Sequence, residues 1–229
     1  MTIGLFIVWL LSLTLLRGDI GKSLAKPKFT EIFSKSQVIN SLSAARLFLF
    51  GARDVWFVVA LPVYLTQTLE WPHWSVGTFF ACWVIGYGFI QSLSPLIIGL
   101  RTGDIATGRI MVAWSSALAI ITGLITAAVY LEYQTSQVLV AGLLLFGAVF
   151  AVNSSLHSYL IVSYSNIERV SMDVGFYYMA NAMGRLIGTV LSGLAYQLYG
   201  LTVCLLISTA FLTIATLVTC KLSLIKTSS

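Results

Sequence analysis

Charged residues are scarce in this sequence. Only 9% of its 229 residues are charged and 58% are hydrophobic, whereas about 25% of the residues in soluble domains are charged. The mean hydropathy is correspondingly high, at +0.93. This composition excludes a soluble domain and predicts an all-α polytopic membrane protein.

Histidine and cysteine are also rare, and catalytic motifs are absent. The histidines are His73 and His157, and the three cysteines, Cys82, Cys204 and Cys220, lie singly in or beside apolar stretches. Without a CxxC pair or a histidine cluster, the sequence predicts neither a disulfide framework nor a metal site. It contains no GxSxG, HExxH or phosphate-binding loop. We therefore expect no enzyme and no cofactor.

Long apolar runs make up most of the chain. A bilayer core is about 30 Å thick and a helix rises about 1.5 Å per residue, so a span needs about 20 apolar residues. Six windows meet this length, at residues 43–67, 76–100, 110–131, 137–163, 174–198 and 201–220. A stretch at 1–16 is too short to span comfortably, and we interpret it as the end of a preceding helix. A cleaved signal peptide is a weaker alternative, because the stretch has no basic start and no small-residue cleavage site.

Four parts follow from these windows. We expect a partial transmembrane helix at 1–16, a basic cytoplasmic loop at 17–42, a six-helix transmembrane bundle at 43–220 and a cytoplasmic tail at 221–229.

Basic residues are distributed unevenly among the connections. Loops around Glu70, Glu132 and Gly200 have none. The alternate connections and the tail hold ten of the 13 basic residues: Arg17, Lys22, Lys26, Lys28, Lys35, Arg101, Arg109, Arg169, Lys221 and Lys226. The positive-inside rule places this second set in the cytoplasm of a multi-pass inner (plasma) membrane protein. The net charge of +5 thus reflects membrane topology, and we expect no nucleic-acid partner.

Four charged residues lie inside the predicted spans. Arg46 is about one turn inside the cytoplasmic end of its window, where we expect its side chain to reach the headgroups as an anchor. Arg53 and Asp54 lie at the centre of that window, where each charge costs about 2.5–3.5 kcal/mol. Adjacent residues on a helix point about 100° apart, so they need not pair. They either form buried ion pairs that fix helix packing or belong to a substrate or proton pathway, with Asp54 the candidate for proton coupling.

Arg185 lies at a similar depth in window 174–198. Two central guanidinium groups with only Asp54 as an acidic partner favour an anionic ligand, because arginine binds carboxylate, phosphate or arsenate oxygens through a planar fork of donors. Gly184, Gly188 and Ser192 recur beside it at four-residue spacing. We interpret these small residues as a close helix contact.

Uncharged polar residues add further candidates. Window 137–163 ends in a polar cluster that we expect to line the same cavity: Asn153, Ser154, Ser155, His157 and Ser158. His157 either contacts substrate or relays protons, or is satisfied by a neighbouring helix. Gln91, in window 76–100, is a further cavity candidate, and Pro95 predicts a kink. The candidate substrate-binding residues are Arg53, Arg185, Asn153, His157 and Gln91.

Two stretches carry a resemblance to a known family. LFLFGARDVWFVVALPVYL at 47–65 and WVIGYGFIQSLSP at 83–95 resemble the ArsJ-type organoarsenical efflux permeases of the major facilitator superfamily. The similarity covers what would be that family's C-terminal half. It implies a six-helix C-terminal bundle that exports an organic anion such as 1-arseno-3-phosphoglycerate and contributes to arsenate resistance. It also implies a functional link to glyceraldehyde-3-phosphate dehydrogenase, which makes this compound from arsenate, and an N-terminal transporter half as partner.

The resemblance has two departures. In the loop GLRTGDIATGRI at 99–110, the interval from Asp104 to Gly108 is one residue longer than the superfamily's usual loop spacing. The superfamily's cavity lies between two halves, and this sequence corresponds to one. A truncated remnant that does not transport, or an assembly partner of a split transporter, is therefore the alternative.

The topology is directly testable. Reporter fusions at Lys28 and Ser229 should both report a cytoplasmic location, and a fusion at Trp71 should report an external one, because basic loops stay inside. Alkaline phosphatase and green fluorescent protein fusions provide the paired measurement. An external signal at Lys28 would contradict the topology.

Overall fold

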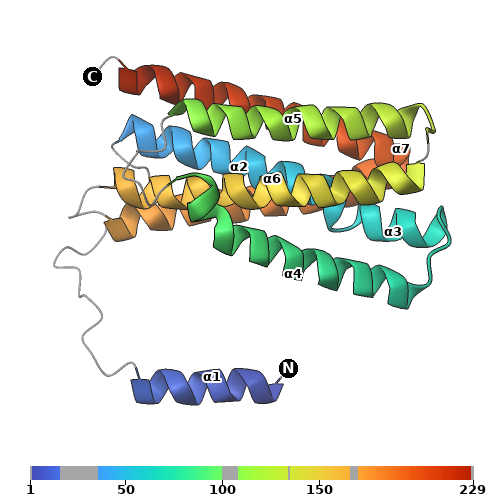
Figure 1. Ribbon diagram of the computed structural model, residues 1–229, viewed down its shortest axis with the longest axis horizontal. Coiled ribbons are helices and arrows are strands. Elements are labelled where there is room, and N and C mark those ends of the chain that lie inside the picture. Colours follow the sequence, from blue (N-terminus) through green and yellow to red (C-terminus); the bar gives the residue numbers. More distant parts are fainter. Residues whose placement is uncertain (1, 16–35, 100–107, 134, 166–169, 228–229) are drawn as a thin grey trace. The chain divides into compact units, whose positions relative to one another are not determined.

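Two units make up the chain in the computed structural model, which describes residues 2–15, 36–99, 108–133, 135–165 and 170–227. The units are Met1–Glu31 and Ile32–Ser229. The first contains α1 (Thr2–Leu15; Figure 1), a 14-residue apolar helix. Its large side chains are exposed. Its interpretation as the end of a preceding helix stays a prediction.

The second unit is a bundle of helices, and every element described in it is helical. Five of its described stretches are long and apolar enough to cross a membrane, at 37–67, 73–97, 109–130, 136–164 and 170–222. The predicted all-α polytopic class is confirmed. The elements are α2 (Gln37–Phe57), α3 (Ala60–Gln67), α4 (His73–Ile97), α5 (Gly108–Tyr130), α6 (Thr135–Tyr164) and α7 (Val170–Thr227).

Gly200 divides α7 into two spans. Its backbone angles, φ 76° and ψ −172°, are non-helical, and positive φ is a conformation that glycine adopts readily. A stretch of 53 residues would measure about 80 Å as one helix, far more than a bilayer core. Figure 1 shows the two halves running in opposite directions. This break agrees with the separate windows predicted at 174–198 and 201–220.

Helices extend past two of the predicted boundaries. α2 begins at Gln37, so residues 37–42 are helical and not part of a loop. Ser36 caps this start by accepting a hydrogen bond from the Ile39 amide, and Ile39 and Leu42 are fully buried, so packing holds the first turns in place. α7 likewise continues through Thr227, beyond the predicted tail boundary at 221. Residues 16–35 of the predicted loop and 100–107 of the loop at 99–110 lie outside the described residues.

A break at Val58 and Val59 separates α2 from α3 within one span. Pro62 explains it, because a proline clashes with the carbonyl four residues earlier, here that of Val58, and has no amide hydrogen to donate. The Ala60 amide donates to Ser192 Oγ of α7 at 3.0 Å. A neighbouring hydroxyl thus accepts a hydrogen bond from a backbone amide at the break, as broken membrane helices require.

Glycines bring α2 and α7 into backbone contact. A methyl group at Gly184 would overlap the Leu47 carbonyl, and one at Gly188 would lie 2.5 Å from the Gly51 oxygen. Ser208, on the second half of α7, donates to the Ala52 carbonyl at 2.7 Å. The interpretation of Gly184 and Gly188 as a close helix contact is confirmed.

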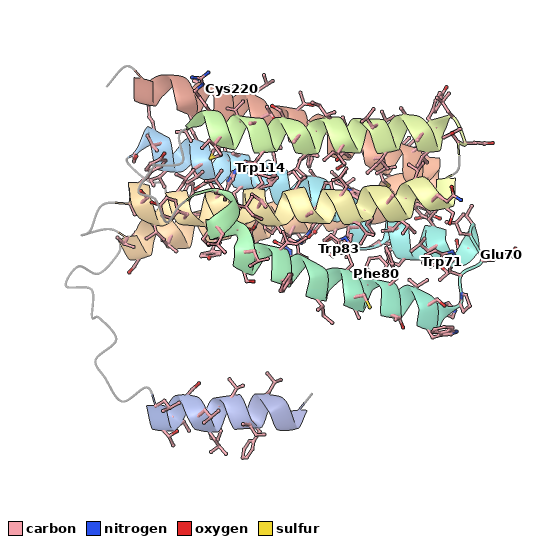
Figure 2. The ribbon with its side chains drawn as sticks, in the orientation of Figure 1. Glu70, Trp71, Phe80, Trp83, Trp114 and Cys220 are labelled. Carbon is pink, nitrogen blue, oxygen red and sulfur yellow. The ribbon has the colours of Figure 1, made fainter. Side chains whose placement is uncertain are left out.

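Trp83 fixes the middle of α4, whose residues are mostly exposed. Its indole lies between α4 and α6 (Figure 2) and donates to the Leu143 carbonyl at 2.9 Å. It lies so close to Gly147 that a methyl group there would come within 2.8 Å of the ring. Towards its His73 end α4 diverges from α6 (Figure 1).

The helix contact predicts a selective effect of one methyl group. Gly184→Ala should lower the free energy of unfolding by roughly 1–3 kcal/mol, because two backbones must separate to admit it. Gly193→Ala is the matched control on the same helix, since a methyl group there meets nothing within 4 Å. Unfolding by denaturing detergent gives the measurement. Equal stability of the two variants would contradict a backbone contact at Gly184.

Candidate functional site

Three helices contribute polar and aromatic residues at helical spacing to one region of the bundle. Residues three, four or seven apart share a face of a helix, so each set forms a stripe. The stripes are Arg46, Phe50 and Arg53 on α2, Phe150, Ser154 and His157 on α6, and Tyr177, Asn181 and Arg185 on α7.

Asp54 binds two arginines, and we call these three residues the arginine cluster. Arg53 contacts Asp54 Oδ1 through Nε and Nη2, both at 2.6 Å. Arg185 of α7 donates through Nε to Asp54 Oδ2 at 3.1 Å. Arg53 and Asp54 therefore pair although they are adjacent, and each carboxylate oxygen contacts a different helix's arginine.

Exposure increases across the arginine cluster. The Asp54 side chain is 1% exposed and that of Arg53 14%, whereas Arg185 is 55% exposed. Two guanidinium groups share one carboxylate, so the cluster has a formal surplus of one positive charge. The Arg53 guanidinium also lies 5.0 Å from the Phe50 ring centre and 5.3 Å from that of Phe150, within the range of cation–π attraction.

Arg46 is not the headgroup anchor that its sequence position predicted. It is only 5% exposed, and its donors bind two other helices. Nη1 donates to the carbonyl and hydroxyl oxygens of Ser154, both at 3.1 Å, and Nε donates to Asn181 Oδ1 at 3.2 Å. Its guanidinium lies 3.9 Å from the Phe50 ring centre and 5.0 Å from that of Tyr177.

The other predicted site residues separate from the arginine cluster. Asn153 is fully buried and donates through Nδ2 to Ser115 Oγ of α5 at 3.2 Å. His157 is 1% exposed and lies one turn beyond Ser154, the partner of Arg46. Gln91 is half-buried on α4 and takes part in none of the cluster's hydrogen bonds. Whether these residues contact a substrate stays a prediction.

Sequence reasoning missed Tyr177 and Asn181. Both precede Arg185 at four-residue intervals, a spacing that places all three on one face of α7. This spacing could have identified both residues. If Arg185 faces α2, then Asn181 on the same face of α7 also faces α2. Asn181 contacts Arg46, which the sequence had assigned to the membrane surface.

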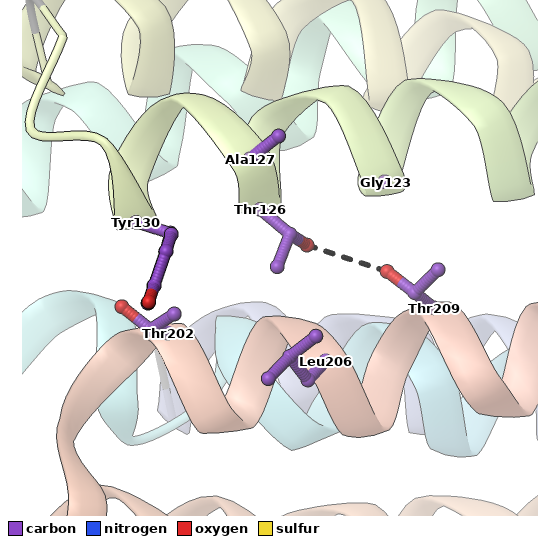
Figure 3. A pocket seen from close by; sticks show the side chains of 7 residues that line it. All are labelled: Gly123, Thr126, Ala127, Tyr130, Thr202, Leu206 and Thr209. Atoms are coloured by element: carbon purple, nitrogen blue, oxygen red, sulfur yellow. Dashed lines mark hydrogen bonds between the residues drawn. The ribbon is translucent and has the colours of Figure 1, made fainter.

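Two open cavities between described helices lie away from these charges. One of about 500 Å³ lies between α5 and the second half of α7, lined mostly by apolar atoms. Figure 3 shows its threonines, of which Thr126 and Thr209 hydrogen-bond at 3.3 Å. Another of about 420 Å³ lies between α5 and α6. Neither has a charged lining residue, so we place the candidate site at the arginines. Among the described residues, no three histidine, cysteine or acidic side chains gather as metal ligands would.

No protein-family model matches the sequence, and no curated protein matches it.

The ion pairs of Asp54 predict that substitutions at Asp54 and Arg53 have non-additive effects on stability. Asp54→Ala should lower the free energy of unfolding by roughly 3–5 kcal/mol, because Arg53 and Arg185 lose their shared partner. Adding Arg53→Ala to that variant should recover part of the loss, since it removes one uncompensated charge. Unfolding titrations of the single and double variants test this, with Glu132→Gln on an exposed turn as control. Additive losses would show that the two residues do not act together.

Proposed function

We propose that this chain is a six-span half of a major facilitator transporter that exports an organic anion, with Arg53 and Arg185 as the anion-binding residues. The observation that carries the proposal is the pair of guanidinium groups that share one carboxylate in the middle of the spans. Ionisable groups at this depth are costly, and they usually face a partner or a transport pathway.

Arg185 has the donors that a ligand needs. Its Nε contacts Asp54, and among the described residues neither terminal nitrogen of the guanidinium has a hydrogen-bond partner, on a side chain that is 55% exposed. A phosphate, arsenate or carboxylate group can bind these two nitrogens side by side. Arg53 lies on the other side of the same carboxylate and supplies a second positive charge.

Asp54 links ligand binding to charge balance. An arriving anion attracts the two arginines that Asp54 holds, and it leaves the carboxylate with fewer donors. An anion with two negative charges exceeds the cluster's surplus of one positive charge, and a proton taken up by Asp54 would then restore neutrality. This exchange is the proposed route for proton coupling, and it uses the one acidic residue of the arginine cluster.

The substrate class comes from the charges and from the resemblance together. An anion with phosphate or arsenate oxygens suits the surplus positive charge, and the ArsJ-type resemblance points to 1-arseno-3-phosphoglycerate. The dehydrogenase that makes this compound is the implied functional partner, and arsenate resistance is the expected outcome.

The proposed transporter also needs a second helical bundle. Large apolar side chains on α4 are exposed, among them Ile85 at 72% and Phe89 at 66%. An N-terminal half of six spans would provide the opposite wall, and rocking of the two halves would expose the site alternately. The starts of α2, α5 and α7 and the ends of α4 and α6 lie at one end of the bundle (Figure 1). We assign that end to the cytoplasmic side of the inner membrane, because the basic segments adjoin it.

One observation favours the alternative of a membrane protein without transport activity. Asp54 contacts both arginines, as it would if the three residues only held helices together. An assembly partner or a truncated remnant needs nothing more from them.

Transport per folded molecule separates the two functions. The chain should be co-expressed with the N-terminal half of an ArsJ-type permease in arsenate-sensitive cells that carry the dehydrogenase, and arsenic retained per cell measured against folded protein. Arg53→Ala and Arg185→Ala should each weaken apparent affinity at least tenfold, because losing a charge-assisted contact typically costs about 2–5 kcal/mol. Lysine should restore little, since it lacks the planar fork.

Arg109→Ala is the matched control, because Arg109 is an exposed arginine in the first turn of α5. It should leave export unchanged. Normal export per folded molecule in both Arg53→Ala and Arg185→Ala would refute the anion site and leave the arginines as packing elements.

A further inference from the structure

Arg46 holds a positive charge that the described residues do not neutralise. It is 5% exposed, and within the described part of the chain no carboxylate lies within ion-pairing distance of it. Its hydrogen-bond partners are neutral oxygens of Ser154 and Asn181. Burying an ion is costly unless a charge of opposite sign or a full set of hydrogen bonds compensates it.

Aromatic contacts compensate the charge only in part. Phe50 and Tyr177 face the guanidinium at 3.9 Å and 5.0 Å from their ring centres. Cation–π attraction of this kind contributes about 0.5–2 kcal/mol. These contacts do not neutralise the positive charge of Arg46, and a bound anion would neutralise it.

Unpartnered polar atoms surround the same part of the bundle. His157 is 1% exposed, and neither ring nitrogen has a hydrogen-bond partner in the described structure. His157 lies three residues beyond Ser154 on α6, and Ser154 accepts hydrogen bonds from Arg46. Asn153 Oδ1 and Ser43 Oγ, which are equally buried, also lack partners there. Buried polar atoms in native proteins are almost always bonded, so a group of them indicates a bound species.

We propose that Arg46 and His157 form a binding site for a small inorganic anion such as chloride, enclosed between α2, α6 and α7. The guanidinium supplies the charge, and the imidazole N–H and the Ser43 hydroxyl supply further donors. Because Arg46 is almost fully enclosed, the site suits a compact ion and excludes an organic substrate.

This site is separate from the arginine cluster and goes beyond the proposed transport function. Arg46 precedes Arg53 by seven residues, or about 10 Å along the helix, and the Phe50 ring contacts both guanidinium groups. The two sites share no hydrogen-bond partner. A bound anion at Arg46 strengthens a junction of three helices whether or not the protein transports anything.

Thermal unfolding provides the test. The chain, in nanodiscs of phosphatidylcholine alone, is melted in sodium gluconate and in increasing sodium chloride at constant ionic strength. This zwitterionic lipid has no net charge, so lipids with net negative headgroups are removed as an alternative source of the anion. Chloride should raise Tm saturably, by about 3–6 °C at ten times its Kd.

Asn181→Asp is the decisive variant. Asn181 Oδ1 accepts a hydrogen bond from Arg46 Nε at 3.2 Å, so an aspartate of the same size places a carboxylate where it can neutralise Arg46. Its Tm in gluconate should rise, and the chloride effect should disappear. Arg46→Gln should also abolish the chloride effect, and if that variant does not fold, Asn181→Asp carries the test.

Arg185→Gln is the control, because it removes a guanidinium of the arginine cluster and leaves Arg46 untouched. It should keep the full chloride response. A wild-type Tm that does not depend on chloride would mean that only water occupies the region and would overturn the proposal. A response that survives Asn181→Asp but is lost in Arg185→Gln would assign the ion to the arginine cluster and would overturn it equally.

Discussion

The backbone contact between α2 and α7 is the constraint on which both candidate sites depend. A methyl group at Gly188 would lie 2.5 Å from the Gly51 oxygen and 3.1 Å from Asp54 Cβ. The Asp54 contact with Arg185 and the Arg46 contact with Asn181 both cross this interface, at 3.1 Å and 3.2 Å. Larger residues at the crossing would move the helices apart, and hydrogen bonds weaken steeply beyond such distances.

The same helix also stabilises the break in the first span. Pro62 interrupts the hydrogen bonding between α2 and α3, and Ser192 of α7 accepts a hydrogen bond from the Ala60 amide at this break. Ser192 follows Arg185 by seven residues, two turns along the same helix. A shift of α7 that moves Arg185 relative to Asp54 therefore also displaces the partner of the broken backbone. The position of Arg185 in the arginine cluster is therefore mechanically connected to the break in the span.

The all-helical class, the apolar spans and the close packing at small residues could be predicted from the sequence. These features follow from the length of the apolar stretches and from helical spacing. It misplaced Arg46 because depth depends on where a helix begins. With a start at 43, Arg46 lies one turn from the headgroups. With the observed start at Gln37, it lies nine residues in, about 14 Å along the axis.

Hydropathy missed this start because the first turns contain polar residues, Gln37, Asn40 and Ser41 among them, although Ile39 and Leu42 pack in the core. The contact between Arg46 and Asn181 depends on how α2 and α7 are rotated relative to each other. The hydrophobic periodicity of a single helix does not predict that rotation.

Arginine suits this interior because one guanidinium can hold two helices and still face a ligand. Arg46 uses Nε for Asn181 and Nη1 for Ser154, and Arg185 uses Nε alone for Asp54. In both residues a nitrogen without a described partner remains on a charged group. A lysine has one nitrogen at the end of a flexible chain, and its donors cannot be divided among fixed directions in this way. Packing and the proposed anion binding are thus not exclusive roles for these residues, since the contacts that fix the helices leave other nitrogens of the same guanidinium groups without a described partner.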